Sequence, residues 1–252
     1  MNAVSVFVWR TFRHIRSNLF GLAIDAAVSP VLLLLIFTLL LGGAIAGSVH
    51  AYIRHLLPGI LVLTVLPMTV YTGTTLCTDI AKGVYDRFRT MPFWQPAAVA
   101  GAIIADSFRY LVALPVVLAA GMALGFRPEN GLPGAALACL YAALLAFAAS
   151  WIFAAIGIVV KQPETVSGSS MMIIYPLLFA SNVLVDTATM PRWLGRLIEL
   201  NPVSIAASTV RVLMHGTAGG TDIAAGIGLI LLILAVFIPL TFRLYRRRNR
   251  NR

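Results

Sequence analysis

The sequence predicts an all-α integral membrane protein with six transmembrane helices, an N-terminal interfacial helix and short re-entrant helices before the last span. Of the 252 residues, 60% are hydrophobic and only 11% are charged, whereas soluble domains carry roughly 25% charged residues. Apolar segments of about 20 residues recur, each long enough to cross a hydrocarbon core of about 30 Å as a helix. These runs lack the period-two alternation of a membrane barrel, so helix is the expected form.

Charge and cysteine content narrow the class further. A net charge of +10 would suggest nucleic acid in a soluble protein, but the sidedness of a membrane explains it here, and we expect no nucleic-acid partner. Cys77 and Cys139 fall inside apolar spans, so we expect them to pack as small buried side chains and not to form a disulfide or a metal site. The start is amphipathic and contains Arg, with no small-residue cleavage pattern, so we expect no cleavable signal peptide.

Residues 2–20 form the expected interfacial helix. Its apolar residues share one helical face, while Arg10, Arg13 and His14 lie opposite. Such a helix rests with its apolar side in lipid and its cations toward anionic headgroups. The alternative is an ordinary positive flank of the first span, and both interpretations place the N-terminus in the cytoplasm.

Six apolar segments are the expected spans: about Leu22–Ala46, Leu56–Cys77, Ser107–Phe126, Gly134–Val160, Met171–Val185 and Ile223–Phe242. Pro30 predicts a kink in the first span. Pro58, Pro67 and Gly73 predict a bend in the second. We expect outer loops at Gly42–His55 and Arg127–Pro133, and a cytoplasmic loop at Lys161–Ser170.

The distribution of basic residues supports this topology. With both termini in the cytoplasm, the inner side holds fourteen Lys and Arg and the outer side five, which accounts for all 19. The five on the outer side are Arg54, Arg127, Arg192, Arg196 and Arg211. This bias satisfies the positive-inside rule, so we expect a multi-pass protein of a bacterial plasma membrane.

Residues 186–221 interrupt the pattern before the last span. They contain two brief amphipathic helices separated at Asn201-Pro202. The first places four apolar residues on one face: Trp193, Leu194, Leu197 and Ile198. Neither helix is long enough to span. They would dip into the outer leaflet and return, which requires protein or water to satisfy the backbone; a plain outer loop resting on lipid is the alternative.

Motifs of several catalytic classes are missing. Lys82 follows Ala81 and Lys161 follows Val160, so neither stands in the Gly-Lys-Ser/Thr of a phosphate-binding loop. The histidines form no His-Glu-x-x-His pattern, and no Gly-x-Ser-x-Gly elbow occurs. Asp25, Asp106 and Arg109 are expected near cytoplasmic ends of spans, not at mid-membrane where ion-coupled carriers place charges. Asp106 and Arg109 are three residues apart and could form a structural ion pair.

The longest polar interruption between spans is Ala81–Tyr110, where a soluble partner could bind; a merely solvated positive loop is the alternative. Its segment from Gly83 to Met91-Pro92 reads GVYDRFRTMP and is followed by Asp106 and Arg109. This pattern resembles the first cytoplasmic loop of ABC-2 type permeases, most closely the daunorubicin-resistance branch of antibiotic and lipid exporters. The stretch from Met190-Pro191 through Asn201-Pro202 to Arg211 is similar to that family's segment before the last span. Span number, order and length match too, although Phe93-Trp94-Gln95 departs from the basic or small residue common there.

The resemblance implies that residues 1–252 are one permease domain, without catalysis of its own, in an exporter of hydrophobic or amphipathic drugs or lipids. A separate ATP-binding cassette ATPase would bind ATP and Mg, and a second permease chain would complete the assembly. The residues implied to contact the ATPase are Lys82, Tyr85, Asp86, Arg87, Phe88, Arg89, Met91 and Pro92. The outer region would be shaped by Pro191, Trp193, Leu194, Asn201, Pro202 and Arg211.

The cargo path of the family lies at the permease dimer interface, where Met171, Met172 and Tyr175 could offer a soft lining or serve as ordinary packing. Gly43-x-x-x-Gly47 and Gly121-x-x-x-Gly125 would permit close helix contact. Two other functions remain open: a membrane-embedded lipid-modifying enzyme and an ion-coupled drug carrier. Within the family, import or polysaccharide export also remains open.

Overall fold

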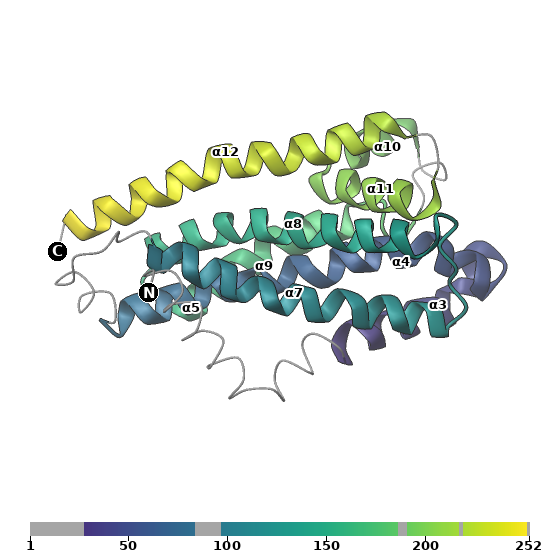
Figure 1. Cartoon of the computed structure of the whole chain (residues 1–252), viewed down its shortest axis with the longest axis horizontal. Coiled ribbons are helices and arrows are strands. Elements are labelled where there is room, and N and C mark those ends of the chain that lie inside the picture. Colours follow the sequence, from purple (N-terminus) through teal and green to yellow (C-terminus); the bar gives the residue numbers. More distant parts are fainter. Residues whose placement is uncertain (1–27, 84–96, 186–190, 217–218, 251–252) are drawn as a thin grey trace.

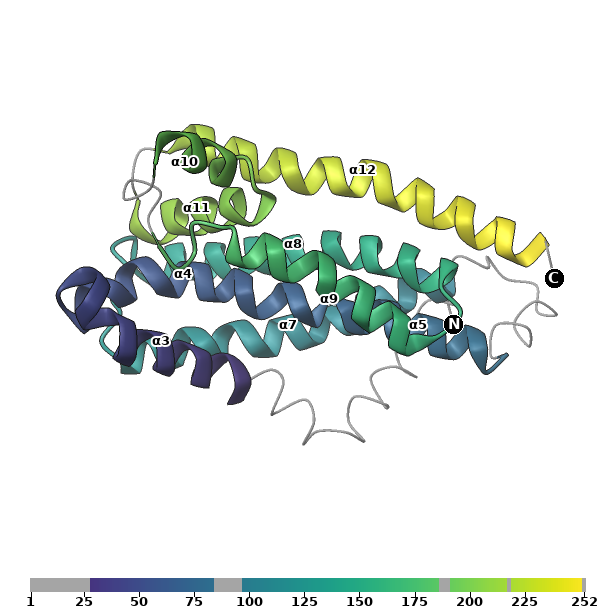
Figure 2. The ribbon, with the colours of Figure 1, turned by 180° about the vertical axis from the view of Figure 1, so that it is seen from behind.

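The computed structural model describes residues 28–83, 97–185, 191–216 and 219–250, and every regular element in these ranges is helical. Long helices run side by side along one axis, and the last helix runs along one side of the bundle in roughly the same direction (Figures 1 and 2). The helices are α3 (Ser29–Ala46), α4 (Val49–Met68), α5 (Val70–Ala81), α7 (Ala97–Ala123), α8 (Gly131–Val159), α9 (Pro163–Phe179), α10 (Arg192–Glu199), α11 (Pro202–His215) and α12 (Gly220–Arg250).

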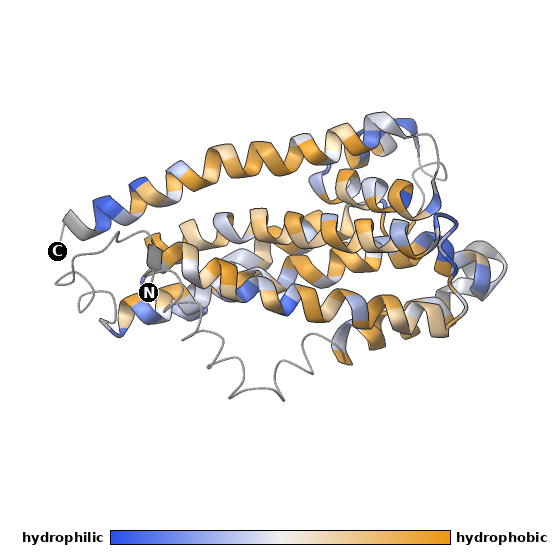
Figure 3. Ribbon diagram, viewed as in Figure 1, coloured by the Kyte–Doolittle hydropathy of each residue, from blue (hydrophilic) through white to orange (hydrophobic). Residues whose placement is uncertain are grey.

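Helix α8 is the centre of the bundle, in contact with α4, α5, α7, α9, α11 and α12. We call the end of the bundle where α5 ends and α7 begins the loop end, and the opposite end, near α10 and α11, the cap end. Apolar residues occupy the middle of the helices, while hydrophilic residues gather toward the two ends (Figure 3). That distribution matches a membrane protein with polar groups near both water interfaces.

Within the described residues, four helical stretches are long and apolar enough to cross a membrane, or five if the bent pair α10–α11 is one span. The four are His50–Ala81, Val99–Ala123, Gly131–Val159 and Gly220–Arg248. The all-helical membrane class is therefore confirmed. The other two expected spans correspond to α3, whose apolar part is Ser29–Leu40, and to α9 with 17 residues, so six spans stay a prediction.

The expected outer loop Gly42–His55 is wrong, because α3 and α4 extend through most of it. Only Gly47 and Ser48 separate the two helices. Gly47 ends α3 with a φ of 69°, a left-handed conformation that glycine adopts without steric cost. The Ser48 hydroxyl oxygen accepts from the amide of Ala51 at 3.1 Å, which satisfies one unpaired N–H at the start of α4.

Two other expected boundaries are wrong at the loop end. Helix α7 begins at Ala97, ten residues before the expected start at Ser107, because the segment AAVAGAIIA is apolar, rich in alanine and free of proline. Helix α9 begins at Pro163, inside the expected loop Lys161–Ser170, since proline suits the first turn where its missing N–H is not needed. Pro30 likewise lies in the first turn of α3 and does not kink it.

The second span is interrupted at Thr69, between α4 and α5, and the bend expected in this span stays a prediction. Pro67 stands just before the interruption, and the Thr69 hydroxyl donates to the carbonyl of Leu66 at 2.6 Å. A proline removes a backbone donor and a side-chain hydroxyl competes for a carbonyl, and both features loosen the helical ladder.

Helices α5 and α8 approach closely at two glycines. A Cβ added to Gly73 would collide with the carbonyl oxygen of Phe153, and one added to Gly157 would collide with the carbonyl oxygen of Gly73. Backbone therefore meets backbone at this crossing, as small residues permit in membrane helices.

Candidate functional site

The expected ATPase contact begins at the loop end of α5. Helix α5 ends at Ala81, and the amide of Lys82 donates to the carbonyl of Thr78 at 3.0 Å. Gly83 follows with a φ of 67°, a helix end that favours glycine. The Lys82 side chain is exposed. The other implied contacts, Tyr85, Asp86, Arg87, Phe88, Arg89, Met91 and Pro92, lie outside the described residues, as do the expected N-terminal helix and Asp25.

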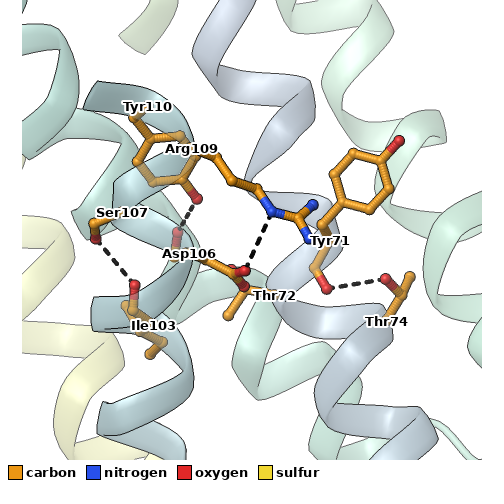
Figure 4. Close-up of polar contacts among 9 residues, drawn as sticks. Tyr71, Thr72, Thr74, Ile103, Asp106, Ser107, Arg109 and Tyr110 are labelled. Atoms are coloured by element: carbon orange, nitrogen blue, oxygen red, sulfur yellow. Dashed lines mark hydrogen bonds and ion pairs between the residues drawn. The ribbon is translucent and has the colours of Figure 1, made fainter. Parts of the chain in front are cut away.

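A polar cluster joins α5 to α7 and α8 (Figure 4). We call it the α5–α7 cluster, and its members are Tyr71, Thr72, Asp106, Arg109, Tyr110 and Ser150. Asp106 is 2% exposed, and its Oδ2 accepts from the hydroxyl of Thr72 at 2.8 Å. A carboxylate so deep in the bundle is stabilised only where donors or cations face it.

Arg109 provides the cation of this cluster. Its Nε lies 3.6 Å from Asp106 Oδ1, so the predicted pair is present. Its guanidinium carbon also lies 5.1 Å from the centre of the Tyr71 ring, within reach of a cation–π interaction. One arginine on α7 therefore contacts both the buried acid of its own helix and an aromatic ring of α5.

Tyr110 extends the cluster to α8. Its hydroxyl lies 2.8 Å from the hydroxyl oxygen of Ser150, which itself donates to the carbonyl of Ala146 at 2.8 Å. Tyr110 is fully buried. Three helices are thus joined by side-chain hydrogen bonds at one level of the bundle.

The depth of the pair differs from expectation. Asp106 and Arg109 lie within the apolar stretch Val99–Ala123, not beside its loop end, because α7 begins earlier than predicted. Ionisable residues at membrane depth are costly, and they pair or serve function. The sequence did not identify Tyr71, Thr72, Tyr110 and Ser150 as members of this cluster, because a local sequence does not show which neighbouring helix a side chain will contact.

A cavity of about 310 Å³ opens beside this cluster, between α3, the junction of α4 and α5, and α9. Tyr71 belongs to its wall, so the α5–α7 cluster and the cavity share one side chain. Its aromatic residues are Phe37, Tyr71, Tyr175 and Phe179, and the Tyr175 and Phe179 rings lie 6.4 Å apart. Apolar walls with a few polar atoms are typical of small-molecule sites.

Of the three residues predicted as a possible lining of the cargo path, the structure places two at the cavity. Met171 and Tyr175 line the cavity. Met172 does not; it is 80% exposed on the outer surface of α9. An exposed side chain on a membrane helix faces lipid or a partner chain.

At the cap end, α10 and α11 are the two short helices that the sequence predicts, and they bend by 81° at their junction. Asn201 lies in the bend, and Pro202 begins α11. Asn201 Oδ1 accepts from the amide of Val203 at 2.9 Å. Its Nδ2 donates to the carbonyls of Leu177 and Ala180 at 2.8 and 2.6 Å. A single side chain thus caps the start of α11 and the end of α9.

Arg211 anchors α11 to the neighbouring segments. Its Nη2 donates to the carbonyl of Asn182 at 2.6 Å and lies 3.1 Å from His55 Nε2. Its Nε donates to the carbonyl of His55 at 3.4 Å. The fork of donors on arginine suits a position that must join several acceptors.

The apolar face predicted for α10 divides between core and surface. Ile198 is buried and Leu194 half-buried, whereas Trp193 and Leu197 are 67% and 61% exposed. The helix begins beside Pro191, whose carbonyl accepts from Leu194 at 2.9 Å. Exposed Trp and Leu on a short helix suit a membrane interface, where an amphipathic ring is stabilised.

Within the part of the chain that the structure describes, no group of three or more His, Cys, Asp or Glu could hold a metal ion. Cys77 and Cys139 are free thiols.

These features define a helical membrane protein with a polar cluster at membrane depth and an open apolar cavity beside it. Residues 2–215 match the family model described as ABC-2 type transporter, and the chain belongs to this family. Membership of an ABC transporter family implies an ATPase partner for the permease.

Two relatives place the chain within the family. It is 48% identical, over 99% of its length and 88% of the relative, to the daunorubicin resistance ABC transporter permease protein DrrB1 of Streptomyces coeruleorubidus. It is 23% identical, over 83% of its length and 78% of the relative, to the probable doxorubicin resistance ABC transporter permease protein DrrC of Mycobacterium tuberculosis strain H37Rv.

Proposed function

We propose that this chain is the transmembrane subunit of an ATP-driven exporter that moves an apolar or amphipathic drug, of the anthracycline kind, out of a bacterial cell. The observation that carries the proposal is the 48% identity, along 99% of the chain, to a permease named for daunorubicin resistance. Export of a lipid is the nearest variant of this function.

The aromatic cavity supports this choice of cargo. Phe37, Tyr71, Tyr175 and Phe179 line it, and their rings suit stacking against a planar polycyclic molecule. Solutes with several charges would lose hydration there without replacement. Ser29 and Thr64 supply hydroxyls in the same wall.

Membership of the family supports the assembly that we propose. One ATPase would bind ATP and Mg and press on the loop end through Lys82 and the residues after it, so this chain itself binds no cofactor and catalyses no reaction. A second permease, either a copy or a sister chain, would close the cargo path. The loop end and both termini would face the cytoplasm across the plasma membrane, and α10–α11 would form a re-entrant cap outside.

A gentle-detergent pull-down from native membranes tests the proposal. Tagged wild type should bring down a cassette protein with ATPase activity, and an Arg87→Ala/Arg89→Ala double mutant should bring down several-fold less. Arg127→Ala, a single change on the expected outer side, is the control. If wild type recovers no ATPase where a known permease does, the exporter assignment fails, and a lipid-modifying enzyme and an ion-coupled carrier become the alternatives to test.

A second candidate, an ion-coupled drug carrier, is favoured by one observation: Asp106 and Arg109 lie inside an apolar span. Such carriers place ionisable residues at this depth. The two functions differ in energy source. Export by a carrier would respond to uncouplers and be indifferent to ATP depletion.

A further inference from the structure

The last helix, α12, ends at the loop end, where one of its arginines contacts the end of α8. Helix α12 runs from the cap end to the loop end, where its cationic segment lies close to the ends of the other helices (Figures 1 and 3). Among its arginines, Arg243, Arg246 and Arg247 are exposed, whereas Arg248 is half-buried. The side chain of Arg248 therefore turns toward the protein.

Arg248 binds the end of α8. Its Nη1 donates to the carbonyl of Ile158, and to that of Val160 at 3.3 Å. The carbonyl of Ile158 is one of the last four of the helix, which have no intrahelical partner. A cation at a helix C-terminus also meets the negative end of the helix dipole.

The carbonyl of Val160 has a second partner. The thiol of Cys77, on α5, donates to it at 3.3 Å. One carbonyl group therefore joins α5, the end of α8 and α12. Helix α9 starts three residues later, at Pro163.

An apolar cluster surrounds this junction. It is separate from the main core and combines buried residues of four helices: Leu76, Ile80, Val99, Ile103, Trp151, Ala154, Ile158 and Tyr245. Tyr245 is 4% exposed. Leu76 and Ile80 come from the end of α5, and Val99 and Ile103 from the start of α7, the two helix ends on either side of residues 84–96.

We propose that Arg248 is a positioning residue for energy coupling, which ties α12 to the loop ends of α5 and α8 so that these ends move as one body. The tether rests on the proposed function, because it transmits motion only if an ATPase drives the loop end. Residues 243–250 are then more than a basic anchor at the membrane surface. Discrete contacts between packed helices carry such coupling.

The native thiols allow the tether to be tested in the permease alone. In Arg248→Ala, opening at Val160 should raise the rate of Cys77 labelling by a small maleimide by about fivefold or more, the effect of a modest loss of local stability. Cys139, in the first third of α8 and far from Val160 along the helix, should label as in wild type. Arg246→Ala and Arg247→Ala are matched controls on the exposed face of the same helix.

The complex with its ATPase supplies the functional readout. With daunorubicin as the probe, Arg248→Ala should keep the cassette bound but lose roughly fivefold or more of the drug-stimulated ATPase rate, the size of a typical coupling effect. Arg248→Lys, which keeps a cationic donor, should restore both readouts to within about twofold of wild type.

Three results overturn the proposal: Arg248→Ala matching the two controls, Arg248→Lys being as defective as Arg248→Ala, or Cys139 labelling rising in parallel with Cys77. A wild-type complex with no stimulated ATPase would instead count against the proposed function, while the Cys77 measurement still decides whether the tether exists.

Discussion

Helix α5 meets α7 and α8 through different kinds of surface, starting at adjacent residues. Thr72 faces α7 and binds Asp106, whereas Gly73 faces α8 and lets the two backbones meet at Gly157. The α7 side depends on a few directional polar contacts around a buried charge. The contact with α8 depends on close packing, because a Cβ added at Gly73 or Gly157 would collide with the backbone of the other helix.

This difference points to separate roles for the two faces of α5, the helix that leads into the segment proposed to contact the ATPase. Close-packed backbones resist small displacements because interiors transmit strain. Polar contacts can exchange one partner for another without a change in packing. We infer that α5 and α8 move together, while the α5–α7 contact is the one able to rearrange.

The largest expected effect is the loss of the buried acid. Asp106→Ala would leave Arg109 without its carboxylate and Thr72 without its acceptor, and breaking a buried pair costs on the order of 3–5 kcal/mol. Unfolding of the purified chain in mixed micelles measures this. Thr74→Ala is the control, because Thr74 is half-buried on α5 and its hydroxyl donates to a carbonyl of its own helix, that of Tyr71; equal stabilities of the two variants would show that the α5–α7 cluster does not hold the helices.

A smaller loss is expected from closing the gap between α5 and α8. Gly73→Ala or Gly157→Ala would force the two backbones apart, and overpacking costs about 1–3 kcal/mol. Gly228→Ala is the matched control, because a Cβ at Gly228 of α12 would meet nothing within 4 Å. The same unfolding assay applies, and a Gly73 variant as stable as the Gly228 variant would refute the close crossing.

The smallest effect is expected for Tyr110→Phe. The change removes one hydrogen bond to Ser150, which keeps its bond to the carbonyl of Ala146. No polar group is left unsatisfied, so the loss should be about 0.5–1.5 kcal/mol. Tyr175→Phe, at a cavity wall, gives a comparison; a cost above that of Asp106→Ala would mean that the tyrosine, not the acid, dominates the cluster.

Sequence patterns predicted local features well where a single segment carries the signal. The break at Asn201-Pro202 was predicted because asparagine and proline mark a helix start, and both lie there in α10–α11. The Asp106–Arg109 pair followed from its spacing of three residues. The position of the pair within its helix was not predicted, because polar residues nearby led us to assign residues 97–106 to a loop.

Contacts between segments were harder to predict. Of the two expected glycine pairs, Gly121 does approach Leu57 of α4, but a Cβ at Gly43 would meet nothing within 4 Å. The closest crossing uses Gly73 and Gly157, which are single glycines on different helices. Nothing in either local sequence identifies the partner, since tertiary packing decides it.

The most direct test of the central claim, that a separate ATPase drives export by this permease, is daunorubicin uptake into inside-out vesicles. The vesicles would contain this chain with its cassette protein, either active or carrying an inactivated ATP site. We predict uptake that requires ATP and the active cassette and survives an uncoupler. Uptake that persists with the inactive cassette and collapses with the uncoupler would contradict the account and identify an ion-coupled carrier acting through Asp106 and Arg109.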